Sequence, residues 1–164
     1  MPLVHIIGLT ATGSTFCSAI ALVSREREED YLWVLSEYKT MMGELGVHVV
    51  VTDRDAALGL AVAAVFPLAQ HNLCRWHINK NIATNCKAFF TDDTFTEFQR
   101  SWSQVVTSKS EQEFQNNADV LLLTLDDLPY VHSYISGLLE LKTQIVSAWT
   151  DKHLHLGSTS SSRV

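Results

Sequence analysis

Asp53 is the acidic residue best placed to do chemistry. It follows Val47–Val51, a run rich in β-branched residues that is typical of a strand buried on both faces. Side chains at the carboxyl end of such a strand are held by the sheet yet open to a crevice. Mg²⁺ prefers one or two carboxylates together with water and phosphate oxygens. Metal ligand and helix N-cap are equally good roles for Asp53 by position, although Asp55 fits the cap better.

A second group of chemically capable residues is the Cys-x-x-His pair formed by Cys74 and His77. Such a pair can supply two zinc ligands, but a structural zinc site needs four. Cys86, His71 or His5 would have to complete the set, and none of them stands at a compelling spacing. A buried cysteine and a hydrogen-bonded histidine near the sheet are therefore the favoured interpretation.

A third candidate is the basic segment from Asn72 to Ala88. It carries Arg75, Lys80 and Lys87 and no acidic residue, although the whole chain has a formal net charge of −6. The bulk charge does not indicate a dedicated DNA-coating module. This segment is nevertheless the best local candidate for contacts to a phosphate backbone, the alternative being a solvated helix face.

Two other patterns are rejected. Gly8 to Thr15 has the glycine spacing of a P-loop, but Ser14 stands where that motif needs lysine, and a strand-like run follows instead of a helix. We therefore expect a hairpin turn there. His153 and His155 alternate like metal ligands, but no carboxylate pattern accompanies them, so ordinary polar roles are favoured.

The elements that would position these residues begin with an antiparallel hairpin. Apolar runs at Leu3–Leu9 and Thr15–Val23 form it. Acidic residues at 28–30 then favour the start of a helix, which should end at Gly43 and Gly46. The buried stripe of that helix is predicted from helical spacing as Val34, Tyr38, Met41 and Leu45. The next expected elements are a helix at Ala56–Val65, a short strand at Gln70–Leu73 and a helix at Ile78–Ala88.

The chain turns entirely helical after about Phe90. Apolar residues recur at helical spacing there, with breaks near residues 109–110 and 127–129. Trp33, Trp102 and Trp149 are expected to be core anchors. The two predicted apolar stripes comprise Phe95, Phe98, Trp102 and Val105, and Val131, Tyr134, Ile135, Leu138, Leu141 and Ile145.

Length and composition set the class of protein. The chain has 164 residues, of which 46% are hydrophobic and 18% charged, so a globular domain with a real core is expected. No apolar run reaches the roughly 18 residues needed to span a bilayer. The first residues lack a basic region, so a secretory signal is not expected. The 3 cysteines are too few for a disulfide framework, which favours a reducing, intracellular setting.

Several segments, in their order and approximate spacing, resemble the Mutator-like element (MULE) transposases and their relatives domesticated as transcription regulators, the FAR-RED IMPAIRED RESPONSE type. The likeness covers residues 2 to about 88 and returns near the C-terminus. Its most specific part is Val65-Phe66-Pro67 followed by residues 71–81, His-Asn-Leu-Cys-Arg-Trp-His-Ile-Asn-Lys-Asn. The other segments are Pro2–Gly8, Glu28–Trp33, Val51–Asp55, Lys152–Gly157 and Thr159–Val164.

This resemblance implies an α/β architecture, namely an incomplete ribonuclease H-like fold whose mixed sheet lacks its first strand. The partial transposase core would cover residues 1–90, an all-helical insertion residues 91–150, and a flexible tail residues 151–164. The family's site has two Asp and one Glu that hold two Mg²⁺ ions for cleavage and joining of DNA. Asp53 matches the second acid, and Cys74 and His77 match the family's Cys-x-x-His signature. DNA as partner and the nucleus as location are implied in the same way.

Two departures from the family bear on activity. The first acid would lie on a strand before Pro2, and the third acid would follow the tail that ends at Val164. We therefore expect a fragment of a DDE transposase domain that does not cleave DNA alone, because one carboxylate cannot hold two cations. The alternative is a domesticated regulator that contacts DNA or protein without cutting. The unpaired edge beside Leu3–Leu9 also predicts self-association.

Overall fold

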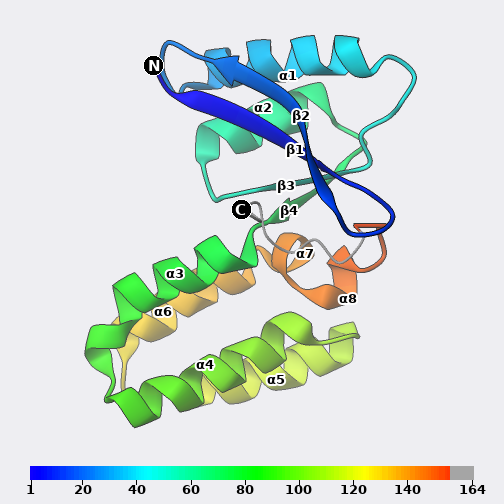
Figure 1. The fold of residues 1–164 in the computed structure, drawn as a ribbon. Coiled ribbons are helices and arrows are strands. Elements are labelled where there is room, and N and C mark those ends of the chain that lie inside the picture. The colour runs from blue at the N-terminus through cyan, green and yellow to red at the C-terminus, as the bar shows by residue number, and fades with distance from the viewer. Residues whose placement is uncertain (156–164) are drawn as a thin grey trace. The chain divides into compact units, whose positions relative to one another are not determined.

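The computed structural model describes residues 1–155 and divides the chain into two compact units. The α/β unit contains Met1–Cys74 and the residues from His153 onward, and the helical unit contains Arg75–Lys152. The chain is thus a mixed α/β protein with small sheets (Figure 1). Most of the predicted tail, residues 156–164, lies outside the described residues. Within residues 1–155, no helix is both long and apolar enough to cross a membrane.

The first sheet of the α/β unit is the predicted hairpin. Strands β1 (Leu3–Leu9) and β2 (Thr15–Leu22) pair antiparallel, with an irregularity between Ile6 and Ile7. The turn needs Gly13, whose φ of 81° is strained for residues with a side chain. A strand follows this turn, which agrees with the rejection of a P-loop. The Ser18 hydroxyl lies 2.9 Å from the Tyr38 hydroxyl and so ties the hairpin to the first helix.

The second sheet is a βαβ unit. Strands β3 (Val49–Thr52) and β4 (Gln70–Leu73) pair in parallel, and helix α2 (Ala56–Val65) connects them, all close to the predicted bounds. Parallel neighbours need such a crossover because a tight turn reverses the chain direction. Among the described residues, this sheet and the hairpin are not hydrogen-bonded to each other.

Helix α1 (Glu28–Met42) begins at the predicted acidic turn and ends at Gly43, whose φ is 56°. Its predicted buried stripe is confirmed at Val34, which is buried, and at Tyr38, which packs against the core, but it was wrong at Met41 and Leu45. Met41 is 68% exposed and Leu45 71% exposed. The helix ends before Leu45, so helical spacing no longer applies there. Besides Val34, the buried side chains of this helix are Tyr31 and Leu35, which the predicted stripe did not include.

Tyr31 and Leu35 share a core with α2, in particular with Val62 and Phe66. Trp33 is 56% exposed, so its prediction as a core anchor was wrong. Its position, two residues after Tyr31, places it roughly opposite the buried face of α1.

The helical unit begins with helix α3, three residues before the predicted Ile78. The remaining helices follow the predicted breaks, and the buried stripe through Phe95, Phe98, Trp102 and Val105 is confirmed. The indole N–H of Trp102 donates to the Asn79 side-chain oxygen at 3.0 Å and so links α4 to α3. This link joins α3 to α4 within the helical unit. Its elements are α3 (Arg75–Cys86), η1 (Lys87–Phe89), α4 (Asp92–Thr107), α5 (Glu111–Leu123), α6 (Pro129–Leu139), α7 (Lys142–Ile145) and α8 (Ser147–Thr150).

Candidate functional site

Asp53 lies immediately after β3, at the carboxyl end of the parallel pair. Its side chain is exposed and lines a cavity of about 660 Å³ in the α/β unit. Within the described residues, its carboxylate makes no hydrogen bond or ion pair with another side chain. A carboxylate held by a sheet and open to a crevice is suited to binding a cation.

The helix-capping role belongs to Asp55. Its Oδ1 accepts a hydrogen bond of 2.7 Å from the backbone N–H of Leu58 in the first turn of α2. An aspartate at this position satisfies an N–H group that has no partner inside the helix. Position alone left two roles open for Asp53, and the structure assigns one of them, the helix cap, to Asp55.

A threonine and a histidine support the backbone next to Asp53. The Thr52 hydroxyl donates to the Asp53 carbonyl oxygen at 2.6 Å and lies 2.8 Å from Nε2 of His71. Because that hydroxyl has only one hydrogen, Nε2 of His71 must be the donor in the second bond. Burial lowers the pKa of His71, which favours the neutral imidazole, and a neutral ring with its proton on Nε2 can make this bond.

Several acids give this edge of the unit a negative potential. The pKa of Tyr31 is raised, first by burial and then by the charges of Asp55, Glu26, Asp53 and Asp30. Sequence reasoning missed this convergence, because the acids of the first helical turn were assigned only to the helix dipole. The signal that could have revealed it is Tyr31, which follows Asp30 directly and lies on the face of α1 that packs against α2.

The described residues do not by themselves form a two-magnesium site. They contain no group of at least three His, Cys, Asp or Glu side chains that could hold a metal ion. Asp53 could supply one ligand, and Asp55 is engaged in the helix cap. Two Mg²⁺ ions close together require several negative ligands to offset their repulsion.

Cys74 and His77 take up positions that agree with a structural role. Cys74 is fully buried directly after β4, and its backbone N–H donates to the Thr52 carbonyl oxygen at 2.6 Å. His77 lies in the first turn of α3, with its ring 4.8 Å from that of Trp76 in a T-shaped contact. Burial raises the pKa of the Cys86 thiol, which disfavours the thiolate form that a zinc ligand needs.

The basic residues of α3 have unequal freedom to contact DNA. The guanidinium of Arg75 donates to the carbonyl oxygens of Ile145 (3.0 Å) and Val106 (3.1 Å) and to the Ser147 hydroxyl (2.9 Å). The chief role of Arg75 is therefore to hold α3 to the segments around Val106 and Ile145 within the helical unit. Burial lowers its pKa, partly offset by the charge of Asp151.

Lys80 and Lys87 are more accessible. Nζ of Lys87 lies 3.2 Å from the Asp92 carboxylate, an exposed ion pair of small energetic value. Nζ of Lys80 lies 5.1 Å from the ring centre of Trp76, which is 53% exposed. A cation beside an exposed aromatic ring is the combination that contacts both the phosphates and the bases of single-stranded nucleic acid.

Comparison with known proteins places these residues in context. A family model described as the MULE transposase domain matches residues 1–81. Protein FAR1-RELATED SEQUENCE 4 of Arabidopsis thaliana is 26% identical over 136 residues, which cover 81% of this chain and 18% of that protein. Protein FAR-RED IMPAIRED RESPONSE 1 of the same plant is 23% identical, with 94% of this chain and 21% of that protein covered.

A fungal match is shorter. The PKS-NRPS hybrid synthetase cheA of Chaetomium globosum is 32% identical over 93 residues, which cover 55% of this chain and 2% of the synthetase. The chain thus spans about a fifth or less of the length of these relatives.

Proposed function

Because residues 1–81 belong to the MULE transposase domain family, related to the FAR-RED IMPAIRED RESPONSE proteins, we propose that the chain is a DNA-binding domain derived from a DDE transposase. Its α/β unit would be part of a ribonuclease H-like fold. Asp53 would be one of the carboxylates that hold Mg²⁺ in such a site. The observation that carries this role is the exposed Asp53 carboxylate at the end of β3, left out of the helix cap that Asp55 forms.

The polypeptide alone should not cut DNA. Since one unengaged carboxylate cannot organise two cations, the 164-residue chain would bind DNA without cleaving it. The test is incubation of the purified chain with plasmid DNA carrying MULE terminal repeats, in Mg²⁺ or Mn²⁺. No nicked or linear product is expected. Cleavage that disappears in the Asp53→Ala variant would contradict the proposal.

DNA binding would depend on α3. Lys80 beside the exposed Trp76 supports this, because lysine neutralises phosphate and releases counterions. In a gel shift, the Lys80→Ala variant should weaken binding and lower the slope of log K against log salt by about 1. Arg100→Ala is the matched control, since Arg100 is an exposed cation on the neighbouring helix α4. Equal losses in both variants would mean that only overall charge matters.

A second candidate function is a regulator that keeps the fold without the chemistry. The similarity to the FAR1-related proteins supports it, because it covers 81% to 94% of this chain and so includes the helical unit, whereas the transposase model ends at residue 81. The two functions differ in their use of Asp53. If the carboxylate is a metal ligand, Asp53→Asn should weaken Mn²⁺ binding measured by calorimetry. If the chain is a regulator only, this substitution changes neither Mn²⁺ binding nor DNA binding.

Both functions place the protein in the nucleus, where its DNA would be. A fluorescent fusion of the full chain should accumulate there. Exclusion of the fusion from the nucleus would contradict both functions.

A further inference from the structure

Trp76 is an exposed aromatic residue on a helix face that is otherwise polar. It is the second residue of α3, and 53% of it is exposed. Lys80 and Thr84 follow it at intervals of four residues, so the three side chains share one face of the helix, and both are exposed. The buried residues of α3 lie on the opposite face and are Ile78, Ile82 and Cys86. Trp76 is therefore not part of an apolar stripe that a further element of the core would cover.

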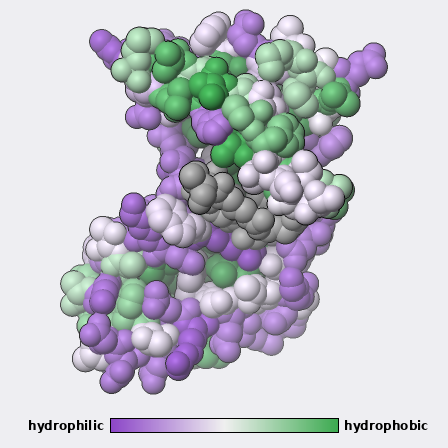
Figure 2. All heavy atoms as spheres, in the orientation of Figure 1, coloured by the Kyte–Doolittle hydropathy of each residue, from purple (hydrophilic) through white to green (hydrophobic). Residues whose placement is uncertain are grey.

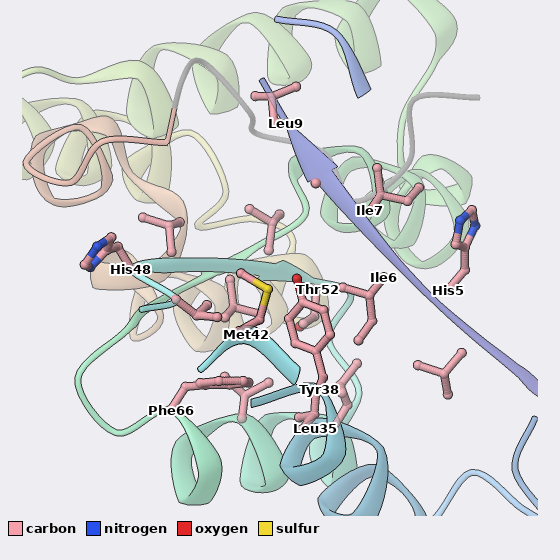
Figure 3. A pocket seen from close by; sticks show the side chains of 18 of the residues that line it. His5, Ile6, Ile7, Leu9, Leu35, Tyr38, Met42, His48, Thr52 and Phe66 are labelled. Atoms are coloured by element: carbon pink, nitrogen blue, oxygen red, sulfur yellow. The ribbon is translucent and has the colours of Figure 1, made fainter. Parts of the chain in front are cut away.

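The aromatic residues at the cavity of the α/β unit have different surroundings. Tyr38 and Phe66 line that cavity and pack with apolar neighbours (Figure 3). Next to the indole of Trp76 lie instead a cation and an imidazole. Nζ of Lys80 is 5.1 Å from the ring centre, and the ring of His77 meets the indole edge to face, with 4.8 Å between centres. The histidine restrains the orientation of the indole, and the lysine supplies a positive charge beside it.

The segment that contains this face is basic, although the chain is acidic. Residues 72–88 hold Arg75, Lys80 and Lys87 and no Asp or Glu, whereas the whole chain has a formal net charge of −6. Arg75 donates its hydrogen bonds inside the helical unit, so the two lysines are the cations that can reach a ligand. The exposed ion pair of Lys87 costs little to break. A ligand that combines negative charge with a flat π surface matches this face.

We propose that Trp76 is a stacking site for an unpaired base of single-stranded DNA and that Lys80 contacts the neighbouring phosphate. The inference rests on the DNA binding proposed above and specifies the form of the DNA. Stacking on an aromatic ring tolerates any sequence, because every base has a π face. The ammonium group of Lys80 can move from the ring to a phosphate, because it sits on a flexible four-carbon stem. This movement also clears the ring for the base.

Duplex DNA fits this face less well. In a duplex the faces of the bases are stacked on one another, and only their edges open into the grooves. A base can stack on Trp76 only after it has been unpaired and unstacked, which costs free energy. A purely electrostatic contact would use Lys80 and Lys87 without involving the indole, and it would not distinguish a single strand from a duplex in this way.

The experiment compares two forms of one oligonucleotide on the full chain. The probe is a fluorescently labelled thymidine strand of about 12 nucleotides, used alone or paired with its complement. Affinities are measured by fluorescence anisotropy at about 50 mM salt, since phosphate contacts weaken steeply as salt rises. We expect the single strand to bind at least about fivefold more tightly than the duplex.

Three protein variants locate the contact. Trp76→Leu should weaken single-strand binding at least about fivefold and leave duplex binding within about twofold. Trp76→Phe keeps an aromatic face and should stay within about threefold of the wild type. Trp33→Leu is the matched control, because Trp33 is 56% exposed on α1 and has Glu37 four residues later, where Trp76 has Lys80. This variant should leave both affinities unchanged.

A spectroscopic signal separates stacking from a charge contact. A 2-aminopurine placed in the middle of the strand loses fluorescence when it stacks on an aromatic ring. Its fluorescence should fall when the wild-type chain binds, and it should fall less in the saturated complex with Trp76→Leu. An equal signal in the two complexes would place the base elsewhere and overturn the inference.

The remaining outcomes separate this inference from the proposed function. Equal affinity for the strand and the duplex, or equal losses of both affinities in Trp76→Leu, would overturn the stacking site and leave DNA binding standing. No binding of either form would overturn both. A loss in Trp33→Leu as large as that in Trp76→Leu would also overturn the stacking site. The comparison of strand with duplex needs only the wild-type chain, so the test stands even if a variant fails to fold.

Discussion

The two units of this protein differ in how completely they bury their apolar residues. Of the largest fully buried side chains among the described residues, all except Val62 and Cys74 belong to the helical unit. Large exposed apolar residues show the opposite bias, and Figure 2 shows many of them gathered over the α/β unit. Those of the α/β unit are Met1, Leu3, Phe16, Ile20, Leu22, Trp33, Met41, Leu45, Leu60, Leu68 and Leu154. We call the helical unit closed because it buries most of its large apolar side chains. We call the α/β unit open because it leaves many of them exposed.

Backbone hydrogen bonding explains the difference. A helix satisfies its N–H and C=O groups internally, whereas a strand needs a neighbour on each side. The helices α4, α5 and α6 therefore only have to bury one apolar face each. The strands β1 and β3 each have one neighbour among the described residues and border the cavity. The candidate cation ligand, Asp53, lies in the open unit.

The largest effect should come from truncating a core residue of the closed unit. Leu121 is fully buried, and Leu121→Ala should cost about 2–5 kcal/mol of unfolding free energy, because it leaves a cavity that the packing cannot fill. Val50→Ala in the half-buried β3 should cost about 1 kcal/mol or less. Urea denaturation followed by circular dichroism measures both. Equal losses of unfolding free energy in the two variants would contradict the view that the helical unit is better packed than the α/β unit.

The next largest effect should come from Arg75→Met. This substitution keeps the aliphatic stem but removes the donors that bond to Ile145, Val106 and Ser147. The buried acceptors lose charged partners, which should cost about 2–3 kcal/mol in the same denaturation experiment. Arg75→Lys should rescue little, because lysine lacks the planar fork. An unfolding free energy equal to that of the wild type would show that the hydrogen bonds of Arg75 do not stabilise the helical unit.

Within the open unit, the two neighbouring aspartates should separate into a structural and a functional residue. Asp55→Ala removes the N-cap of α2 and should lower the unfolding free energy by about 1 kcal/mol. Asp53→Ala should leave stability unchanged within about 0.5 kcal/mol, since its carboxylate is exposed. Thermal melts of both variants test this contrast. A loss at Asp53 as large as that at Asp55 would assign it a structural role.

The smallest effect is a pH dependence from His71. Burial lowers its folded-state pKa below the unfolded value of about 6.5. The unfolded chain therefore binds more protons between the two pKa values, and stability falls as the pH drops below about 6.5. The slope from this group cannot exceed about 1.4 kcal/mol per pH unit. His71→Gln should flatten the profile of unfolding free energy between about pH 5 and pH 7, the range that contains the unfolded-state pKa of about 6.5.

The control for this pH profile is the exposed His153. His153→Gln should leave the slope as in the wild type. If both substitutions flatten the profile equally, burial of His71 is not its cause.

The sequence predicts the helices and strands of this fold better than it predicts which of them pack against one another. Local signals were sufficient for the β1–β2 hairpin, the cap at Asp55 and the buried stripe of α4, since each depends on residues close in sequence. Helical spacing failed for Leu45, because it does not show that the helix ends at Met42. It also failed for Met41, because spacing within one helix does not show how far along that helix its neighbours reach. The acids before Tyr31 were assigned only to the helix dipole. Their proximity to Asp53 depends on the packing of α1 against α2, which local sequence does not show.

Hydrogen exchange measured by mass spectrometry on the full chain is the most direct test of the difference between an open and a closed unit. Amides of α4, α5 and α6 should exchange slowly, while peptides that cover β1 and β3 should exchange at least about a hundredfold faster, because strands with an open edge unfold locally at low cost. Protection of β1 and β3 equal to that of α4 in the isolated chain would contradict the account.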